Sequence, residues 1–542
     1  MTHMADGRHR VSLALVIAGV VLFSLATTYL NWVKHISLRP TWSYDLALYH
    51  NTAFNLTQGR TIHYLLVDAF FSRWKHHERV WDEHEGPSIY RSTHFSPMRM
   101  LVFNQLYRLR PNIVTLFFLQ SLIIALGALP LYLFGTQQTR EPRLGLLLAL
   151  SYLLHPVVLQ MAFNDFRDIQ LGVSFALFAL WFHATRRPVP FVVAALLMLS
   201  CREEYLFLLA LFGVINWRLI SSQDRRLRWA LAPLLLALLW AGVTNSYYVY
   251  FYGRPSPFPG HSGAALKGWT EFALGELQRL PGFLRTMLLP LAVGALIPDA
   301  IVVALLFMSR SDAGAWPAFP HSQLHQFSPA VAVIFWAFVC GVVRLWPWLT
   351  QNRQRRAWGQ GALLAAALVG FAQFGWGAAR AYLIGGFPRY EELTRINDAL
   401  PADATVMAHW HVVARFSNHM RVFSQQGLPL GTGPARREPE IRAVLPEVIA
   451  VCDLVATGPE DGWIDALVVE SGRFLAPQRV NRFHIFVAKA DAPRPSNPDL
   501  RLQEILRWDQ MSKTKRRWAD ILVRESGERL RGFGKDGHSP SP

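Results

Sequence analysis

The stretch VSLALVIAGVVLFSLATTYL, from Val11 to Leu30, contains no charged residue and follows a basic start with Arg8 and Arg10. An α-helix needs about 20 apolar residues to cross a bilayer, so this stretch is long enough to span one. A basic start before an apolar run also occurs in secretory signal peptides, but no small-residue cleavage pattern follows here. We therefore predict that the segment is retained as a membrane anchor.

Further apolar runs follow, several of them shorter than a full span. They lie at residues 112–134, 144–161, 171–184, 190–200, 205–217, 229–251, 283–296, 300–308, 329–343 and 358–383. The pieces at 283–296 and 300–308 form either a tight hairpin around Pro298 or one broken helix. The chain is 52% hydrophobic and 17% charged, with a mean hydropathy of +0.19. We expect an all-α polytopic membrane bundle of about 11 helices, with sizeable water-exposed parts.

Short arginine clusters between these runs predict the orientation of the chain. They lie at residues 140–143, 186–187, 218–228 and 344–356. Cytoplasmic loops are enriched in Lys and Arg, and all four clusters face the cytoplasm if the N-terminus does. Topology also explains the formal net charge of +17 better than a nucleic-acid partner does. We predict a multi-pass protein of the plasma (inner) membrane with a cytoplasmic N-terminus.

Composition divides the chain into three parts. Residues 1–385 form the membrane domain, with a long first outer loop at 31–111. From Tyr390 onward, short β-like runs at 405–408, 421–423, 454–456, 466–469 and 484–488 alternate with helical material. This alternation predicts a small α/β domain at 386–495, on the extracytoplasmic side. Residues 496–542 are basic, with an end rich in Gly, Ser and Pro, and are predicted to be partly disordered.

Acidic residues lie at the ends of several apolar runs, where charge is costly and usually carries function. Asp45, beside Tyr44, follows the first run in an aromatic, partly desolvated setting that favours a general base. The alternative is a helix N-cap for residues 46–56. At the end of the same loop, Arg91, His94 and Arg99 either bind an anionic group or anchor the chain at the interface.

Two short turns add further acidic groups. Asp165 and Asp168 lie three residues apart, where they either hold a divalent cation, with Asn164 or Gln170, or cap helices beside Arg167. The sequence Arg202-Glu203-Glu204 sits between two apolar runs, as an ion pair or as the lining of a polar cavity.

His321 and His325 precede a late apolar run on the same predicted face of the membrane, where the alternative role is that of ordinary surface residues. The convergence of these segments predicts a cavity for the polar group of a lipid.

The order of four motifs resembles the DUF2079 family of predicted bacterial and archaeal membrane proteins. The motifs are Tyr44-Asp45-Leu46, His94-Phe-Ser-Pro97, Asn164-Asp165-Phe-Arg-Asp168 and Arg202-Glu203-Glu204. A later stretch, His325-Gln-Phe-Ser-Pro329, looks like the His-Tyr element of that family. The chain departs from the family at two places. Arg167-Asp168 replaces the usual His-Pro-Glu, and Arg202 replaces the usual Lys.

The DUF2079 family is distantly similar to GT-C glycosyltransferases, which are membrane enzymes that use polyprenyl-phosphate sugars. The resemblance implies inverting transfer of a sugar from such a donor to a cell-envelope glycan, lipid or protein, with Asp45 as the catalytic base. The residues that the resemblance suggests for binding the lipid phosphate are Arg91, His94, Arg202, His321 and His325. The remaining substrate contacts are expected from Tyr44, Asp165, Asp168, Glu203 and Glu204.

No cofactor is expected other than a divalent cation at the Asp165–Asp168 turn, and no nucleic acid. The alternatives to an enzyme are a transporter or flippase of an anionic lipid-linked solute, and a non-catalytic envelope scaffold. Transport requires ionisable groups along a path through the membrane midplane, whereas here they crowd one end of the apolar runs.

Overall fold

The structure is a computed structural model. It describes residues 2–36, 43–57, 96–217, 223–252, 293–294, 296, 328–379, 391–409, 412–419, 421–424, 445–446, 448–458, 462–480 and 482–495. Predictions for Arg91, His94, His321 and His325, and most of those for residues 283–308, lie outside the described residues. The chain divides into two compact units. One joins residues 1–34 to 94–387, and the other joins residues 35–93 to 388–542.

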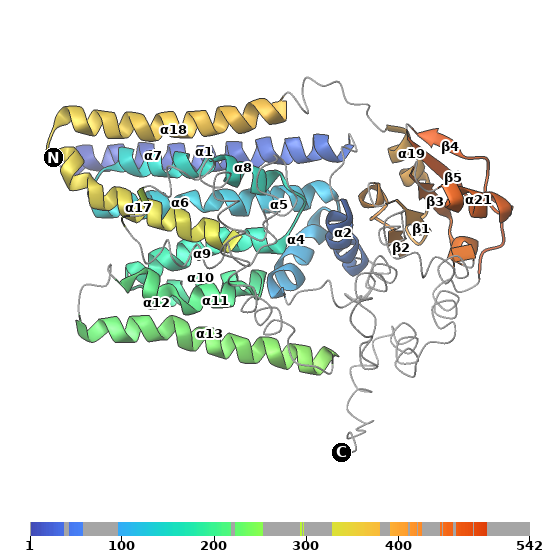
Figure 1. Ribbon diagram of the computed structural model, residues 1–542, viewed down its shortest axis with the longest axis horizontal. Coiled ribbons are helices and arrows are strands. Elements are labelled where there is room, and N and C mark those ends of the chain that lie inside the picture. Colours follow the sequence, from blue (N-terminus) through green and yellow to red (C-terminus); the bar gives the residue numbers. More distant parts are fainter. Residues whose placement is uncertain are drawn as a thin grey trace, which may run out of the picture. The chain divides into compact units, whose positions relative to one another are not determined.

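All the regular secondary structure described in the first unit is helical. Its helices are α1 (Thr2–Ile36), the π-helix η2 (Met98–Phe103), α4 (Asn104–Leu109), α5 (Ile113–Leu126), α6 (Ala128–Thr139), α7 (Pro142–Leu153), α8 (Pro156–Phe163), α9 (Asp168–Ala184), α10 (Pro188–Cys201), α11 (Tyr205–Ala210), α12 (Phe212–Ile215), α13 (Gln223–Tyr252), α17 (Ser328–Thr350) and α18 (Arg353–Ala379). In Figure 1 the axes of the long helices α1, α13, α17 and α18 are nearly parallel, and α17 and α18, joined by a tight turn, run in opposite directions.

Within the described residues, four helical stretches are long and apolar enough to cross a membrane: Gly7–Ile36, Ile113–Thr139, Leu227–Ser246 and Ser328–Thr350. Helices α7 and α8 make a fifth if they count as one span bent by 51°. This is fewer than the predicted 11, in part because α9 and α10 have only 17 and 14 residues and the run at 205–217 is divided between the short helices α11 and α12. The predicted runs at 283–296 and 300–308 lie mostly outside the described residues, so they are not part of this count.

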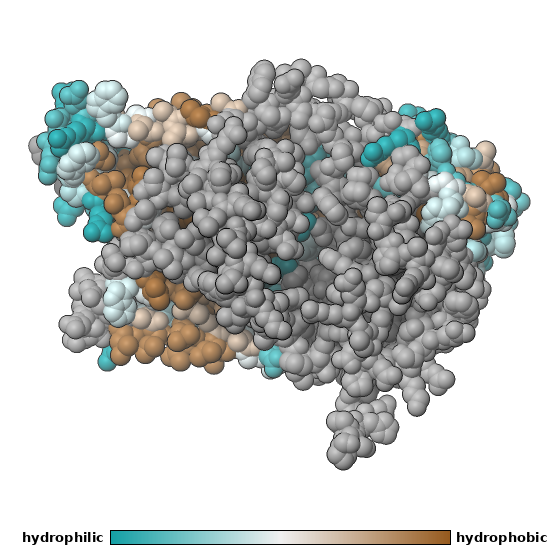
Figure 2. All heavy atoms as spheres, viewed as in Figure 1, coloured by the Kyte–Doolittle hydropathy of each residue, from teal (hydrophilic) through white to brown (hydrophobic). Residues whose placement is uncertain are grey.

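Apolar side chains remain exposed on the outer helices of this unit. On α13 they include Leu227, Leu231, Leu235, Leu238 and Leu239, which contribute to the brown surface along that helix in Figure 2. A soluble protein rarely exposes such a long contiguous apolar face. The faces fit contact with lipid and explain why the bundle is hydrophobic on the outside as well as inside.

The two ends of the bundle differ in chemistry. Near the start of α1, His9 stacks on Tyr132, and Arg356 at the start of α18 pairs with Glu141 at 2.7 Å. Near the end of α1, Lys34 contacts the turn between α8 and α9. A helix rises about 1.5 Å per residue, so His9 and Lys34 are roughly 37 Å apart along α1. The arginine-rich turns at 140–143, 186–187 and 350–356 therefore lie at one end of the bundle, and the acidic turns lie toward the other.

The second unit contains a five-stranded mixed sheet in the order β2-β1-β3-β5-β4. Its strands are β1 (Thr405–Ala408), β2 (Arg421–Ser424), β3 (Leu454–Thr457), β4 (Gln478–Val480) and β5 (Phe483–Val487). Strand β1 pairs in parallel with β2 and β3, while β5 is antiparallel to β3 and β4. Among the described residues, the helices of this unit include α2 (Ser43–Thr57), α19 (Glu391–Ala399), the 3-10 helix η7 (Val413–Arg415) and α21 (Gly462–Glu470), and residues 445–446 and 448–451 are also helical.

Four of the five expected strand positions carry strands, and one prediction is wrong. The run 466–469 lies inside α21, where Ile464 and Val468 are buried one helical turn apart. Strand β4 was not predicted, because its three residues include the exposed Gln478 and Arg479 and give no alternating pattern. The expected division of the chain at residues 385 and 495 stays a prediction.

One buried polar network ties four helical segments of the first unit together. Trp336 Nε1 on α17 donates to Asn216 Oδ1 at 2.8 Å, and Asn216 Nδ2 lies 2.9 Å from His183 Nδ1 on α9. The other ring nitrogen, His183 Nε2, lies 2.7 Å from the Trp229 carbonyl on α13. Asn216 follows the end of α12, so its one amide group links α9, α12 and α17.

We expect Asn216→Ala to lower the unfolding free energy of the purified protein by about 1–3 kcal/mol, because it leaves the Trp336 and His183 nitrogens without their buried partner. The measurement is the thermal unfolding midpoint in detergent. Ser151→Ala is the matched control, since the buried Ser151 hydroxyl has no hydrogen-bond partner among the described residues. Equal midpoints for the two variants would show that the network contributes no stability.

Candidate functional site

The end of helix α8 is buried, and side chains from other helices bind its last carbonyls. Asn31 Nδ2 donates to the Ala162 carbonyl at 2.7 Å, and Lys34 Nζ donates to the Phe163 carbonyl at 3.0 Å. Gln120 Nε2 donates to the carbonyls of Met161 and Asn164 at 3.3 and 2.9 Å. The last carbonyls of a helix have no partner within it, and a buried one is costly if unbonded. Helices α1 and α5 thus replace the water that an exposed helix end would bind.

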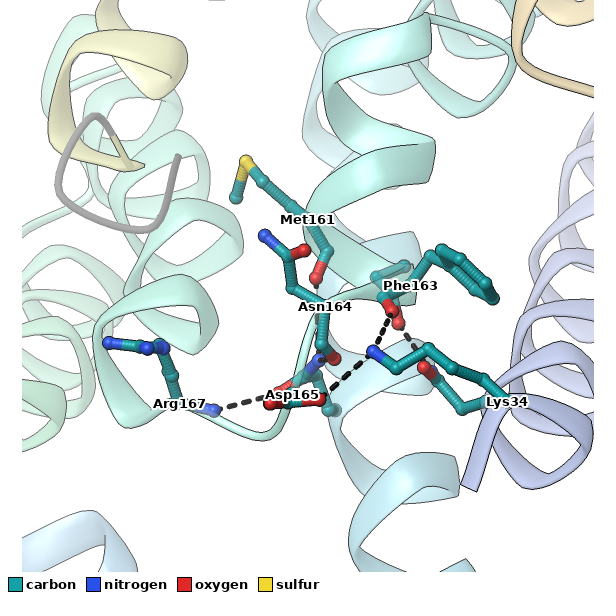
Figure 3. A network of polar contacts seen from close by, with 9 residues as sticks. Lys34, Met161, Phe163, Asn164, Asp165 and Arg167 are labelled. Atoms are coloured by element: carbon teal, nitrogen blue, oxygen red, sulfur yellow. Dashed lines mark hydrogen bonds and ion pairs between the residues drawn. The ribbon is translucent and has the colours of Figure 1, made fainter. Parts of the chain in front are cut away.

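The same lysine forms a buried ion pair, shown in Figure 3. Lys34 Nζ lies 2.9 Å from Asp165 Oδ1, and the two side chains are only 6% and 7% exposed. The ammonium also lies 5.1 Å from the centre of the Phe163 ring. Both charges would be strongly disfavoured alone at this depth, so each requires the other. Asp165 therefore neutralises the cation that caps α8.

Gln120 also holds the other side of the turn. Its Oε1 accepts from the Arg167 backbone N–H at 2.9 Å, while its Nε2 donates to the Asn164 carbonyl. One amide group on α5 thus spans the irregular residues between α8 and α9. Gln120 is fully buried. The turn is fixed in place by contacts that its own residues do not supply.

Asp168 contacts the second acidic segment, Arg202-Glu203-Glu204. Arg202 Nη1 lies 3.6 Å from Asp168 Oδ1, and Arg202 Nε lies 3.2 Å from Glu204 Oε2. Tyr205 positions this segment, because its hydroxyl donates to the Ile169 carbonyl at 2.7 Å. Its ring packs on Gly172, where a Cβ atom would overlap it. The structure therefore brings Asp168, Arg202 and Glu204 together. Glu203, which lies between Arg202 and Glu204 in the sequence, is also buried.

The two aspartates of the turn bind different cations. Asp165 pairs with Lys34 and Asp168 with Arg202, so the pattern is that of two ion pairs rather than of two carboxylates converging on one ion. Among the described residues, no group of three His, Cys, Asp or Glu side chains has metal-binding geometry.

Helix α2, which carries Asp45 in its first turn, belongs to the second unit. It begins at Ser43, two residues before Asp45, so the N-cap alternative, which began the helix at 46, placed its start too late. The structure describes the backbone of Tyr44 and Asp45 and not their side chains.

Two other side chains of α2 bind the C-terminal residues. His50 Nδ1 lies 2.7 Å from Ser417 Oγ. Asn51 Nδ2 donates to the carbonyls of Ser417 and His419 at 3.0 and 2.7 Å. The helix with the candidate base is thus held by residues more than 360 positions later in the chain.

Sequence reasoning missed Lys34, Gln120 and Asn51. Lys34 was read as part of the loop after the first apolar run, and its place at the end of that run was the available signal. Gln120 is an uncharged polar residue inside an apolar run, a pattern that signals a buried hydrogen-bond partner. Nothing in the local sequence around Asn51 signals its contact with the distant Ser417.

We expect Lys34→Met to lower the unfolding free energy by about 3–5 kcal/mol, because Asp165 would remain buried without a cation. The double variant Lys34→Met with Asp165→Leu should recover much of this loss, since neither charge then remains. The measurement is the unfolding midpoint in detergent for the two single variants and the double variant. Additive losses in the double variant would contradict a coupled pair.

We expect acid to weaken the docking of α2. Burial lowers the pKa of His50 to about 3, from an ordinary value of 6.5, and burial also lowers the pKa of His419. The docked helix holds neutral His50, so its full stability is present above pH 6.5 and is lost as the pH falls toward 3. At pH 5 the loss from His50 is about 2 kcal/mol.

Hydrogen exchange of the α2 amides at pH 7 and pH 5, corrected for intrinsic rates, measures this loss. His50→Gln is the control, because glutamine cannot titrate and its protection should change less with pH. Equal protection of wild-type α2 at both pH values would contradict the role of His50.

The family model described as "Predicted membrane protein (DUF2079)" matches residues 34–369. Among solved structures, the chain is similar to the crystal structure of ArnT from Cupriavidus metallidurans bound to undecaprenyl phosphate. The identity is 13% and the TM-score 0.46, over 88% of this chain and 99% of that one. For the apo state of the same protein, the identity is 13% and the TM-score 0.45, over 89% and 100%. No curated protein matches. Because the family model covers more than half of the sequence, the chain belongs to the DUF2079 family of predicted membrane proteins, and this confirms the resemblance seen in its motifs.

Proposed function

We propose that this protein is a membrane glycosyltransferase of GT-C type. It transfers a sugar from a polyprenyl-phosphate donor to a cell-envelope acceptor, with inversion at the anomeric carbon. The observation that carries the proposal is the gathering of ionisable side chains toward one end of the helix bundle, away from the arginine-rich turns. These side chains are Lys34, Asp165, Asp168, Arg202, Glu203 and Glu204. Charge buried at membrane depth is costly and usually functional.

The proposed orientation in the membrane follows from the difference between the arginine-rich end and the acidic end of the bundle. The arginine-rich turns face the cytoplasm under the positive-inside rule, so the acidic end faces outward. A lipid-linked donor then keeps its chain in the bilayer and its head group at the acidic end. The exposed leucines of α13 are suited to contact with the surrounding lipid.

Arg202 is the described residue best suited to the donor phosphate. Its guanidinium is already held by Asp168 and Glu204, and its side chain is 11% exposed. A guanidinium carries five N–H donors in a fixed plane, so two carboxylates can orient it while other N–H groups face an anion. Held in this way, it stabilises the negative charge that develops on the departing phosphate.

Asp45 is the proposed base. Its carboxylate takes the proton from an acceptor hydroxyl as the hydroxyl oxygen attacks the anomeric carbon. The bond between that carbon and the phosphate oxygen breaks, and its electron pair leaves with the polyprenyl phosphate. Attack on the face opposite the leaving group inverts the anomeric configuration. Docking of α2 through His50 and Asn51 fixes the helix that carries this carboxylate.

We expect Asp45→Asn to lower sugar transfer at least 1000-fold while the protein stays folded and inserted, because the amide cannot accept the proton. The measurement is the transfer of radiolabel from a panel of polyprenyl-phosphate sugars by protein in vesicles. Glu470→Gln, at the exposed end of α21, is the control and should leave transfer unchanged.

The same assay separates the alternatives. Movement of label across the vesicle membrane without turnover would indicate a carrier, and neither movement nor turnover would indicate a scaffold. Full activity of the Asp45→Asn variant would reject the proposed mechanism.

A further inference from the structure

Three buried polar groups near the turn between α8 and α9 have no hydrogen-bond partner among the described residues. Gln170 is completely buried, and neither atom of its amide is bonded. The Ser121 hydroxyl is also completely buried and unbonded, and Asn164 Nδ2 is unbonded in a side chain that is 9% exposed. We call Gln170, Ser121 and Asn164 the amide cluster.

Two members of the cluster lie on helices that pack against each other, Ser121 on α5 and Gln170 on α9. Gln120 on α5 bonds the Arg167 N–H, just before α9, and Ser174 on α9 bonds the Ile124 carbonyl of α5 at 2.9 Å. Both contacts advance along the chain together, so the two helices run in the same direction. Gln170 lies one helical turn before Ser174, on the same face, and Ser121 lies about one turn before Ile124. Gln170 and Ser121 are thus at about the same height along the two packed helices.

Asn164 joins the same region through Gln120, the neighbour of Ser121 in α5. Gln120 donates to the Asn164 carbonyl at 2.9 Å, so the end of α8 lies against this part of α5. Figure 3 shows that the Asn164 amide points away from Lys34. Its unbonded nitrogen therefore lies on the side opposite the Lys34–Asp165 pair.

Each buried amide or hydroxyl without a hydrogen-bond partner lowers the stability of the fold, so three of them together are markedly destabilising. Folded proteins satisfy nearly all such groups, and the exceptions call for water or a ligand. Gln170 and Ser121 each offer both a donor and an acceptor, and Asn164 offers a donor. Sugar hydroxyls match this set, since each both donates and accepts. A phosphate only accepts, so the Gln170 carbonyl oxygen would repel it.

We propose that the amide cluster binds the hydroxyls of the sugar carried by the lipid donor. This inference rests on the proposed function, and it assigns sugar selectivity to neutral groups on α5, α8 and α9 that are separate from the ion pairs. The cluster lies among helices of the bundle rather than on its exposed surface, and this favours the lipid-linked sugar over a soluble acceptor.

The test compares Gln170→Met with Gln360→Met. Methionine matches glutamine in size and removes the amide. Gln360 on α18 has an amide nitrogen that also lacks a partner among the described residues, so it is a control of the same type. Each purified protein is mixed with polyprenyl phosphate alone or with polyprenyl phosphate carrying one of a panel of hexoses and pentoses, and the thermal midpoint is recorded.

We expect the wild type and Gln360→Met to be stabilised more by at least one sugar-bearing lipid than by the bare phosphate. In Gln170→Met, the midpoint without ligand should be equal or higher, since an unsatisfied group is gone. Stabilisation by the bare phosphate should remain, while affinity for the sugar-bearing lipid should fall about 10- to 100-fold.

The inference is overturned if Gln170→Met keeps the sugar-dependent stabilisation, or if no sugar in the panel adds to the stabilisation of the wild type by the bare phosphate. Transfer measured on the same samples separates the two proposals. If sugar transfer occurs and Gln170→Met equals the wild type in transfer and in sugar-dependent stabilisation, the sugar subsite is rejected and the proposal of an enzyme is supported. If the sugar-bearing lipid stabilises the wild type but not Gln170→Met, and no sugar is transferred, the sugar subsite is supported and the proposal of an enzyme is rejected. A rise in KM for the acceptor alone would also reject the assignment to the donor.

Discussion

The buried end of helix α8 is the constraint on which the acidic turn depends. A helix that ends inside a bundle leaves carbonyl groups that water cannot reach, and at membrane depth each must find a partner in the protein. Asn31, Lys34 and Gln120 bind the carbonyls of residues 161–164. A lysine in this position brings a charge that must in turn be neutralised, and Asp165 does so. The first ion pair is thus a consequence of how α8 ends.

The second ion pair is built on the other side of the same turn. Arg202 lies between Asp168 and Glu204, and Tyr205 packs against Gly172, so the start of α9 lies close to the end of α10. Both helices are shorter than a full span, and Asp168 at the start of α9 and Glu203 just after α10 are buried within the bundle. Short helices with buried, paired charges keep ionisable groups out of bulk water, where their interactions with a charged ligand are stronger than at an exposed surface. In the proposed enzyme, Arg202 benefits from this setting.

Satisfied and unsatisfied polar groups lie within a few residues of one another. Gln120 uses both ends of its amide to hold the turn, whereas the hydroxyl of its neighbour Ser121 and both amide atoms of Gln170 have no hydrogen-bond partner among the described residues. The same chemical groups serve two purposes, because those that are bonded stabilise the fold and those that are not remain available to a ligand. Groups of the second kind lower stability until they are bound, which is a common property of binding sites.

The sequence by itself determined the class of the protein, its family and many of its elements. Apolar runs of about 20 residues are an unambiguous signal, because a helix of that length has few other places to bury its surface. The order of the motifs from Tyr44 to Glu204 identified the family, and short β-like runs predicted four strands of the sheet. The sequence also brought Asp165, Asp168 and Arg202 to attention, because charge beside an apolar run is conspicuous.

Only the tertiary structure decided which charges pair with which. The ion pair between Lys34 and Asp165 and the contact between Asn51 and Ser417 join residues that are more than 100 positions apart, and no local pattern encodes such a meeting. The tertiary structure also showed that Gln120 is bonded and Gln170 is not, although both are glutamines inside apolar helices. Periodicity reports which face of a helix is buried, whereas pairing depends on how whole helices pack, and that is settled by the sum of many contacts.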